Sequence, residues 1–92
     1  MLNVTDQAAQ ELNEVREHND VPPENCLRLL ITPGGQFGFG VDAEKQGDQV
    51  VHCGETKVLL IGRDLSVKLE GKRLDVQQTE QGAEFFVGPS TP

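Results

Sequence analysis

The pair His52-Cys53 is the stretch of this sequence whose residue types come closest to a chemical site. An imidazole beside a thiol suits a metal site or a nucleophile–base pair. Because adjacent residues of a strand point to opposite faces, the two can converge on one atom only if the strand ends there, before Gly54. Two protein ligands are too few for a closed metal site unless another subunit contributes. Cys53 is therefore a weak candidate metal contact, and the alternative is a strand-end thiol beside a strand-face His52.

The second cysteine and the second histidine offer less chemistry. Cys26 stands directly before the apolar Leu27, and a free cysteine often behaves as a small buried apolar residue. His18 lies where we expect a helix to end, and a cationic side chain there favours the negative end of the helix dipole. The carboxylates are scattered, and neither Ser66 nor Ser90 stands in a nucleophile-elbow motif. We assign no catalytic residue and predict that the protein is not an enzyme.

The stretch "GFGVDA" at Gly38–Ala43 matches the spacing of a dinucleotide-binding fingerprint. That motif requires a preceding strand and a helix that opens directly on it, within a parallel βαβ unit. Here the glycines alternate with Phe37, Phe39 and Val41, and no helical pattern follows. We therefore predict a strand whose glycines leave one face bare, for a closely packed neighbour or a bulge.

Composition excludes several classes of partner. The formal net charge is −7, and no run of basic residues could neutralise the phosphates of nucleic acid or of an anionic membrane. No apolar segment approaches the roughly 20 residues that span a bilayer. The first residues, "MLNVTDQAAQ", lack the basic and apolar regions of a signal peptide. With two cysteines, we expect a reducing cytoplasm and no structural disulfide.

The periodicity of apolar residues changes once along the chain. Residues 5–19 predict a helix that begins after Thr5 as N-cap, with an apolar stripe of Ala8, Ala9, Leu12 and Val15. Beyond Pro22-Pro23 the apolar residues alternate, which is typical of strands. The expected strands are 27–32, 37–42, 49–53, 57–61, 72–77 and 83–87, with turn residues between them.

A short helical turn should interrupt these strands. Asp64 is a candidate cap, Leu65 and Leu69 should face the core, and Gly71 suits the left-handed position that ends the turn. We therefore predict a single α+β domain over residues 1–92, with an N-terminal helix and mainly antiparallel β-sheets. The expected core contains Leu12, Val15, Leu29, Ile31, Val58, Leu60 and Phe85.

Several strings, in their order and spacing, resemble one known family. The opening "LNVTDQAAQEL" is similar to a Ser/Thr-Asp cap that introduces an Ala-rich helix, and "LRLLITPGG" is similar to a strand and loop of the form "LRLGV…SGC". "VVHCGETKVLLIGRDLSVKLEGKRLDV" and "GAEFFVGPS" match the later strands and the end of the same pattern. Together they resemble the HesB/IscA-like domain of the A-type iron–sulfur cluster carriers, over nearly all of the chain.

The resemblance implies a ligand set that this sequence lacks. The family holds iron or a cluster with one cysteine in the loop after the first long strand and with two in a C-x-C near the C-terminus. Gly35 stands at the place of the first cysteine, and the sequence ends at Thr91-Pro92, where the tail with the C-x-C would begin. The resemblance therefore implies the fold, whereas none of the three ligands can be carried over.

Two functions remain open from the sequence. The first is a protein of iron or iron–sulfur metabolism that pairs with a ligand-bearing relative. The second is a ligand-free protein-interaction module that keeps the fold. In both, we expect a protein partner and no resident cofactor, with iron or an iron–sulfur cluster as the alternative. A second copy of the chain is a further candidate partner.

Overall fold

The structure, a computed structural model, describes residues 1–89. Its long helix, α1 (Asp6–His18), begins after Thr5, whose Oγ1 accepts a hydrogen bond of 3.1 Å from the backbone N–H of Ala8. Ala8, Ala9 and Leu12 are buried on one side of the helix. The N-cap and the apolar stripe predicted from the sequence are confirmed.

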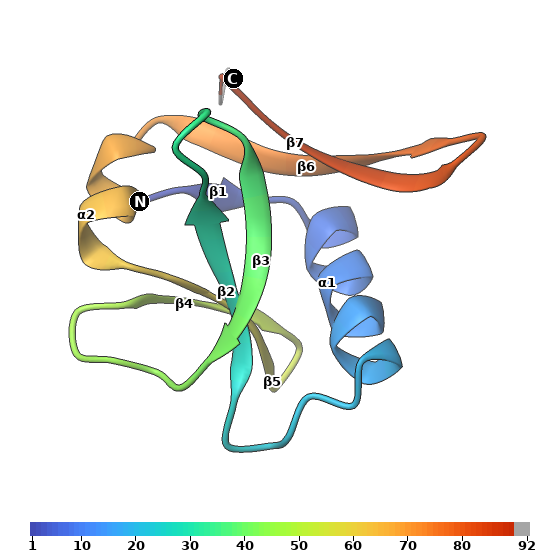
Figure 1. Ribbon diagram of the computed structural model, residues 1–92, viewed down its shortest axis with the longest axis horizontal. Helices are drawn as coiled ribbons and strands as arrows, with labels where there is room; N and C mark the ends of the chain where they lie inside the picture. The colour runs from blue at the N-terminus through green and yellow to red at the C-terminus, as the bar shows by residue number, and fades with distance from the viewer. Residues whose placement is uncertain (90–92) are drawn as a thin grey trace.

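The strands form two sheets (Figure 1). The four-stranded sheet has the order β3-β2-β5-β4, and its strands are β2 (Cys26–Ile31), β3 (Phe37–Asp42), β4 (Gln49–Cys53) and β5 (Thr56–Ile61). Two antiparallel hairpins, β2–β3 and β4–β5, meet where β2 and β5 pair in parallel at Arg28 and Leu60. The parallel junction places both hairpin loops at defined, opposite ends of the sheet.

The second sheet has three strands in the order β1-β6-β7. Its strands are β1 (Asn3–Val4), β6 (Lys72–Thr79) and β7 (Gly82–Pro89), and the helix α2 (Arg63–Lys68) connects β5 to β6. The β6–β7 hairpin extends beyond α1 in Figure 1. The architecture is α+β with mainly antiparallel pairing, as predicted, although the short β1 and its parallel pairing with β6 were not predicted.

The core lies between α1 and the sheets. It contains Leu12, Leu29 and Val58, with Val15 and Phe85 packed against it, and these predictions are confirmed. The prediction that Ile31 belongs to the core is wrong, because its side chain is 42% exposed. Ile31 pairs with Phe37 in the last rung before the β2–β3 loop, beyond the part of the sheet that is covered.

Leu60 is fully buried, but it lies outside this core cluster and lines a cavity beside Cys26. The prediction that Asp64 caps α2 is also wrong. The N-cap is Gly62, and Asp64 lies inside the first turn, where its charge still favours the positive helix end. Gly71 has a φ of +79°, the left-handed conformation expected of it.

Arg28 ties the 43–48 connection to the four-stranded sheet. Its Nε donates to Asp42 Oδ2 at 2.9 Å, and its Nη2 donates to Asp48 Oδ2 at 2.6 Å. The Asp48 side chain is only 4% exposed, and the hydrogen bond from Arg28 holds the pKa of this carboxyl below its usual range. The segment that leads into β4 is thereby fixed by charge-assisted hydrogen bonds.

Gly38–Asp42 lies in the regular β2–β3 ladder, and the antiparallel partner strand excludes the parallel βαβ context of a dinucleotide site. Gly40 explains one of the predicted bare positions: a Cβ there would lie 3.0 Å from Leu30 Cδ1, so Leu30 packs across this glycine. Within residues 1–89, no helix is long and apolar enough to cross a membrane.

Candidate functional site

The β2–β3 loop is the position at which the family resemblance predicts a ligand, and backbone hydrogen bonds close it tightly. The N–H of Thr32 donates to the carbonyl of Gln36 at 2.8 Å, and the N–H of Gly35 donates to the carbonyl of Thr32 at 2.8 Å. Thr32 Oγ1 also accepts from the N–H of Gln36 at 3.1 Å. The exposed loop offers a hydroxyl, an amide and carbonyl groups, but no thiolate.

Gly35 has a backbone suited to glycine and open space around it. Its φ is +84°, and no atom of the described residues, neighbours in the chain aside, lies within 4 Å of the place a Cβ would take. Steric crowding therefore does not exclude a larger side chain, whereas the left-handed backbone disfavours one. The loop keeps its shape without the side chain that the family uses.

Both thiols lie at the end of the four-stranded sheet opposite this loop. Cys26 opens β2, and the loop follows Ile31, so the strand separates them by about 16 Å at roughly 3.3 Å per residue. β4 runs antiparallel to β5 and hence opposite to β2, which brings Cys53 to the same far end, where it pairs with Thr56. Neither cysteine can substitute for a ligand at position 35.

The structure places His52 and Cys53 at the end of β4, as the sequence predicted. A β-bulge lies between Val51 and His52, His52 is exposed, and the half-buried Cys53 packs against the core. Gly54 follows with a φ of +63°. Cys53 lines a shallow hollow of about 220 Å³ that also includes Asp6 at the start of α1. His52 lines the same hollow, but no third metal-binding side chain is grouped with the two so as to hold an ion within residues 1–89, and Cys53 stays a weak proposed metal contact.

Within residues 1–89, the arrangement of donor side chains does not match that of an iron–sulfur cluster site. Among residues 1–89, no three histidine, cysteine, aspartate or glutamate side chains are grouped so as to hold a metal ion. Iron–sulfur clusters are held chiefly by cysteine thiolates, with about four for a typical cluster. The place of the family's C-x-C, after Thr91-Pro92, lies outside the described residues. Where the structure describes the chain, the residues present do not form the family's site.

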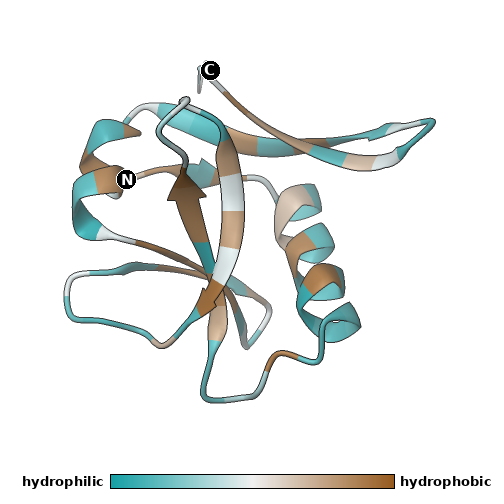
Figure 2. Cartoon of the chain, viewed as in Figure 1, coloured by the Kyte–Doolittle hydropathy of each residue, from teal (hydrophilic) through white to brown (hydrophobic). Residues whose placement is uncertain are grey.

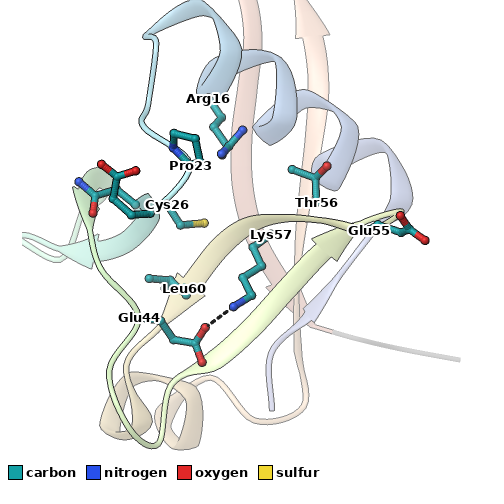
Figure 3. A pocket seen from close by; sticks show the side chains of 10 residues that line it. Arg16, Pro23, Cys26, Glu44, Glu55, Thr56, Lys57 and Leu60 are labelled. Atoms are coloured by element: carbon teal, nitrogen blue, oxygen red, sulfur yellow. Dashed lines mark hydrogen bonds and ion pairs between the residues drawn. The ribbon is translucent and has the colours of Figure 1, made fainter.

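Cys26 borders a cavity of about 410 Å³ (Figure 3). Its side chain is buried, and burial raises the pKa of this thiol, although Arg16 and Lys57 nearby act in the opposite direction. The raised pKa disfavours the thiolate, which is the form that acts as a nucleophile or a metal ligand. The prediction that Cys26 is a packed, buried side chain is confirmed.

Sequence reasoning missed the two cations beside Cys26. Arg16 belongs to the last turn of α1, and Lys57 lies on β5, so both are distant from Cys26 along the chain. Each of them stands in a segment whose charged residues suit a solvated face. Only the pairing of β2 with β5, and the packing of α1 on these strands, brings them together.

The fold and the loop together define a class of small α+β domain with a closed ligand loop. Comparisons with known proteins show which family it belongs to. No protein-family model matches the sequence. The iron–sulfur cluster insertion protein ErpA of Psychrobacter cryohalolentis is 31% identical over 91 residues, which are 95% of this chain and 71% of that protein. ErpA of Nitrosomonas europaea, also named for iron–sulfur cluster insertion, is 32% identical over 90 residues, 94% of this chain and 74% of its own length.

Solved structures show the same fold. Escherichia coli SufA, which is involved in the biosynthesis of iron–sulfur clusters, aligns with a TM-score of 0.67 at 20% identity over 96% of this chain and 84% of its own. IscA with its 2Fe–2S cluster aligns with a TM-score of 0.64 at 18% identity, over 97% of this chain and 85% of that one. A protein from Aquifex aeolicus gives 0.66 at 26% identity, over 95% and 89% of the two chains.

The chain belongs to the HesB/IscA-like family of A-type iron–sulfur carriers. The resemblance drawn from the sequence is confirmed. Because the family consists of carrier and scaffold proteins, the protein is not an enzyme, as predicted. Its relation to iron–sulfur cluster assembly follows from its relatives.

Proposed function

We propose that this chain acts in iron–sulfur cluster assembly as a protein-binding member of its family that holds no cluster through the β2–β3 loop. The observation that carries the proposal is Gly35 in a closed loop without a thiolate, at the place of the family's first cysteine. Relatives named for cluster insertion support the process. The positions of Cys26 and Cys53, at the opposite end of the sheet, support the absence of a substitute ligand.

The surface around the loop supports a role in binding a protein. Ile31 and Phe37 form the strand pair next to the loop and share one face of the sheet, where they are 42% and 41% exposed, whereas Leu30 is 45% exposed on the other face. Figure 2 shows the hydrophobic colour at the ends of β2 and β3 next to this loop. Apolar side chains gathered at one place on a surface often mark a protein-interaction site. We call Ile31 and Phe37 the loop-end patch.

We infer that the partner is a ligand-bearing relative, in which the missing thiolates are supplied by the other chain. The alternative is a ligand-free interaction module whose partner lies outside iron–sulfur metabolism, and the bare chemistry of the loop is compatible with it. For both we propose one domain over residues 1–92 and a cytoplasmic location, in keeping with the acidic charge of −7 and two unpaired thiols.

Binding to a relative tests the proposal. Escherichia coli SufA, reconstituted anaerobically with iron and sulfide, is mixed with this chain, and complex formation is followed by analytical ultracentrifugation. We expect a complex that Phe37→Ser weakens. The matched control is Phe86→Ser, because Phe86 is 40% exposed but lies on β7 in the other sheet.

The outcomes separate the two functions. A complex that Phe37→Ser weakens and Phe86→Ser leaves intact supports partnership with a cluster-bearing relative through the loop-end patch. If the two proteins do not associate at any tested concentration, and this chain alone develops no thiolate-to-iron absorption band, the ligand-free module replaces the first proposal. A strong band in this chain alone contradicts both.

A further inference from the structure

The cavity beside Cys26 is separate from the β2–β3 loop and is not explained by the proposed function. It has a volume of about 410 Å³, within the range of about 300–1,000 Å³ that small-molecule pockets occupy. Its walls come from the end of α1, the segment before β2, the 43–48 connection and β5. In Figure 3, Arg16 and Pro23 lie on one side of the Cys26 sulfur and Leu60 on the other, while Lys57 points away from it toward Glu44.

Arg16 brings an unsatisfied donor to this cavity. Its Nε is buried and has no hydrogen-bond partner within residues 1–89, and Figure 3 shows its side chain extending from α1 toward Cys26. Buried polar groups are nearly always paired, and an unpaired one costs free energy because it has lost its water. A guanidinium presents several donors in a planar fork that matches a carboxylate. Because the Nε is shielded from solvent, a ligand in the cavity would pair with the outer nitrogens of the guanidinium, for which an anionic acceptor is the best partner.

The neighbouring charges limit which anion fits. Lys57 Nζ donates to Glu44 Oε1 at 2.7 Å at the rim, so this ammonium is already paired. Glu24 and Glu55 also line the cavity. Glu24, Glu55 and the Lys57-paired Glu44 outnumber the two cations, so they repel a doubly charged ligand more strongly than a singly charged one, which can still pair with Arg16.

The remaining lining is apolar. Pro23, Leu60 and the neutral Cys26 thiol contribute to the walls, and Leu60 and Cys26 are buried beneath the cavity. A ligand with an apolar body and one terminal charge would contact these groups while its charged end reaches Arg16. A strongly hydrated inorganic anion would make no apolar contact with these walls.

We propose that this cavity binds a small organic monocarboxylate, with the carboxylate on the Arg16 guanidinium and the apolar body against Pro23, Cys26 and Leu60. The inference does not depend on the proposed function. Its failure would leave the account of the β2–β3 loop unchanged, and the binding of SufA does not test it.

Benzoate, its uncharged isostere benzamide and inorganic phosphate serve as probes in an NMR titration of the full chain. We expect saturable benzoate shifts at Asn25, Cys26 and Thr56, and about 10-fold weaker binding of benzamide and phosphate. Arg16→Gln should weaken benzoate about 10-fold, since it removes the charge-assisted pair. Arg73→Gln is the matched control, because Arg73 Nε is also buried without a hydrogen bond but lies on β6, away from the cavity.

The alkylation rate of Cys26 gives a second readout of benzoate binding. Bound benzoate should slow the alkylation of Cys26 and leave that of Cys53 unchanged. If benzamide binds as tightly as benzoate, or if Arg16→Gln leaves benzoate binding intact, the guanidinium is not the receptor and the proposal fails. If benzoate gives no saturable shift, the proposal also fails, and the cavity holds only water. These comparisons of ligands use the wild-type chain, so they stand even if Arg16→Gln does not fold.

Discussion

Gly35 combines two properties that matter separately for any attempt to restore a ligand. A cysteine there would meet no steric obstacle within 4 Å, but it would have to adopt a φ of +84°. That conformation costs an L-residue about 1–2 kcal/mol. The side chain would also be only one of the three thiolates that the family uses, because Cys26 and Cys53 lie at the other end of the sheet.

We therefore expect Gly35→Cys to fold, to lose about 1–2 kcal/mol of stability and to bind no stable cluster. Urea denaturation measures the first effect, and iron and sulfide analysis of the purified variant measures the second. Gly34→Cys is the matched control, since Gly34 is not among the glycines with a positive φ, and it should lose less stability. Stoichiometric iron and sulfide in Gly35→Cys would show that one thiolate suffices.

The two thiols should differ in reactivity. Cys26 is 4% exposed, and burial raises its pKa, whereas Cys53 is half-buried at a strand end. Because alkylation requires an accessible thiolate, Cys53 should react with iodoacetamide faster than Cys26 in the native protein. Mass spectrometry of partly labelled protein gives the order directly. Faster labelling of Cys26 would mean that the segment before β2 opens readily.

At the scale of single residues, the sequence was sufficient to predict the surroundings of some side chains but not of others. The burial of Cys26 follows from its place before an apolar strand, whereas the hollow that His52 and Cys53 share could not be predicted from strand alternation. The partnership of Arg16 with Cys26 could not be predicted, because it depends on how α1 packs on β2 and β5. No periodicity within one segment records contacts between segments.

At the scale of the elements, the β2 strand contains both a confirmed and a wrong core prediction. Leu29 is 2% exposed and Ile31 is 42% exposed, although both lie on one face of the strand. Alternation assigns residues to a face, but it does not show how far along the strand the core extends. The parallel pairings β1–β6 and β2–β5 could likewise not be predicted, because they join segments distant in the sequence.

Leu29→Ala should destabilise the protein by about 2–5 kcal/mol, because it removes a fully buried side chain and leaves a cavity. Ile31→Ala, two residues further along the same face, should cost less than about 1 kcal/mol because its side chain is already exposed. Denaturant titrations of both variants make the comparison. Equal losses would place the edge of the core beyond Ile31.

The Arg28–Asp48 pair should make the stability of the 43–48 connection, which leads into β4, sensitive to acid. The pKa of Asp48 is lowered in the folded protein, chiefly by the hydrogen bond from Arg28. A carboxyl with a lowered folded-state pKa contributes stability that is present above its ordinary pKa of about 3.9 and is lost as the pH falls through the folded-state value. Acid should therefore weaken the segment from residue 43 to residue 48.

Urea midpoints at about pH 7 and pH 3 measure this effect. The wild type should lose stability on acidification, and Asp48→Asn should be less stable at pH 7 but lose less between the two values. Glu80→Gln, in the exposed turn between β6 and β7, is the control and should keep the wild-type difference. An unchanged pH dependence in Asp48→Asn would remove Asp48 from the acid response.

At the scale of the whole molecule, the fold is that of the A-type carriers while the described ligand positions are not. The TM-score to SufA is 0.67, and both sheets of this chain are formed. The β2–β3 loop nevertheless contains a glycine in place of the expected thiolate. The fold could be predicted because apolar periodicity, caps and turn glycines all agree with it. The binding partner could not be predicted, because a patch such as Ile31 and Phe37 emerges only when two strand ends meet at a loop.

The iron and acid-labile sulfide content of this chain, measured after anaerobic reconstitution and removal of unbound metal with E. coli SufA treated in parallel, tests most directly whether the chain holds a cluster. We expect this chain to retain no more iron and sulfide than its Cys26→Ala/Cys53→Ser double variant, while SufA retains both. Stoichiometric iron and sulfide in the wild-type chain, lost in the double variant, would contradict the proposal, because the two thiols at the end of the sheet opposite the β2–β3 loop would then have to form a site.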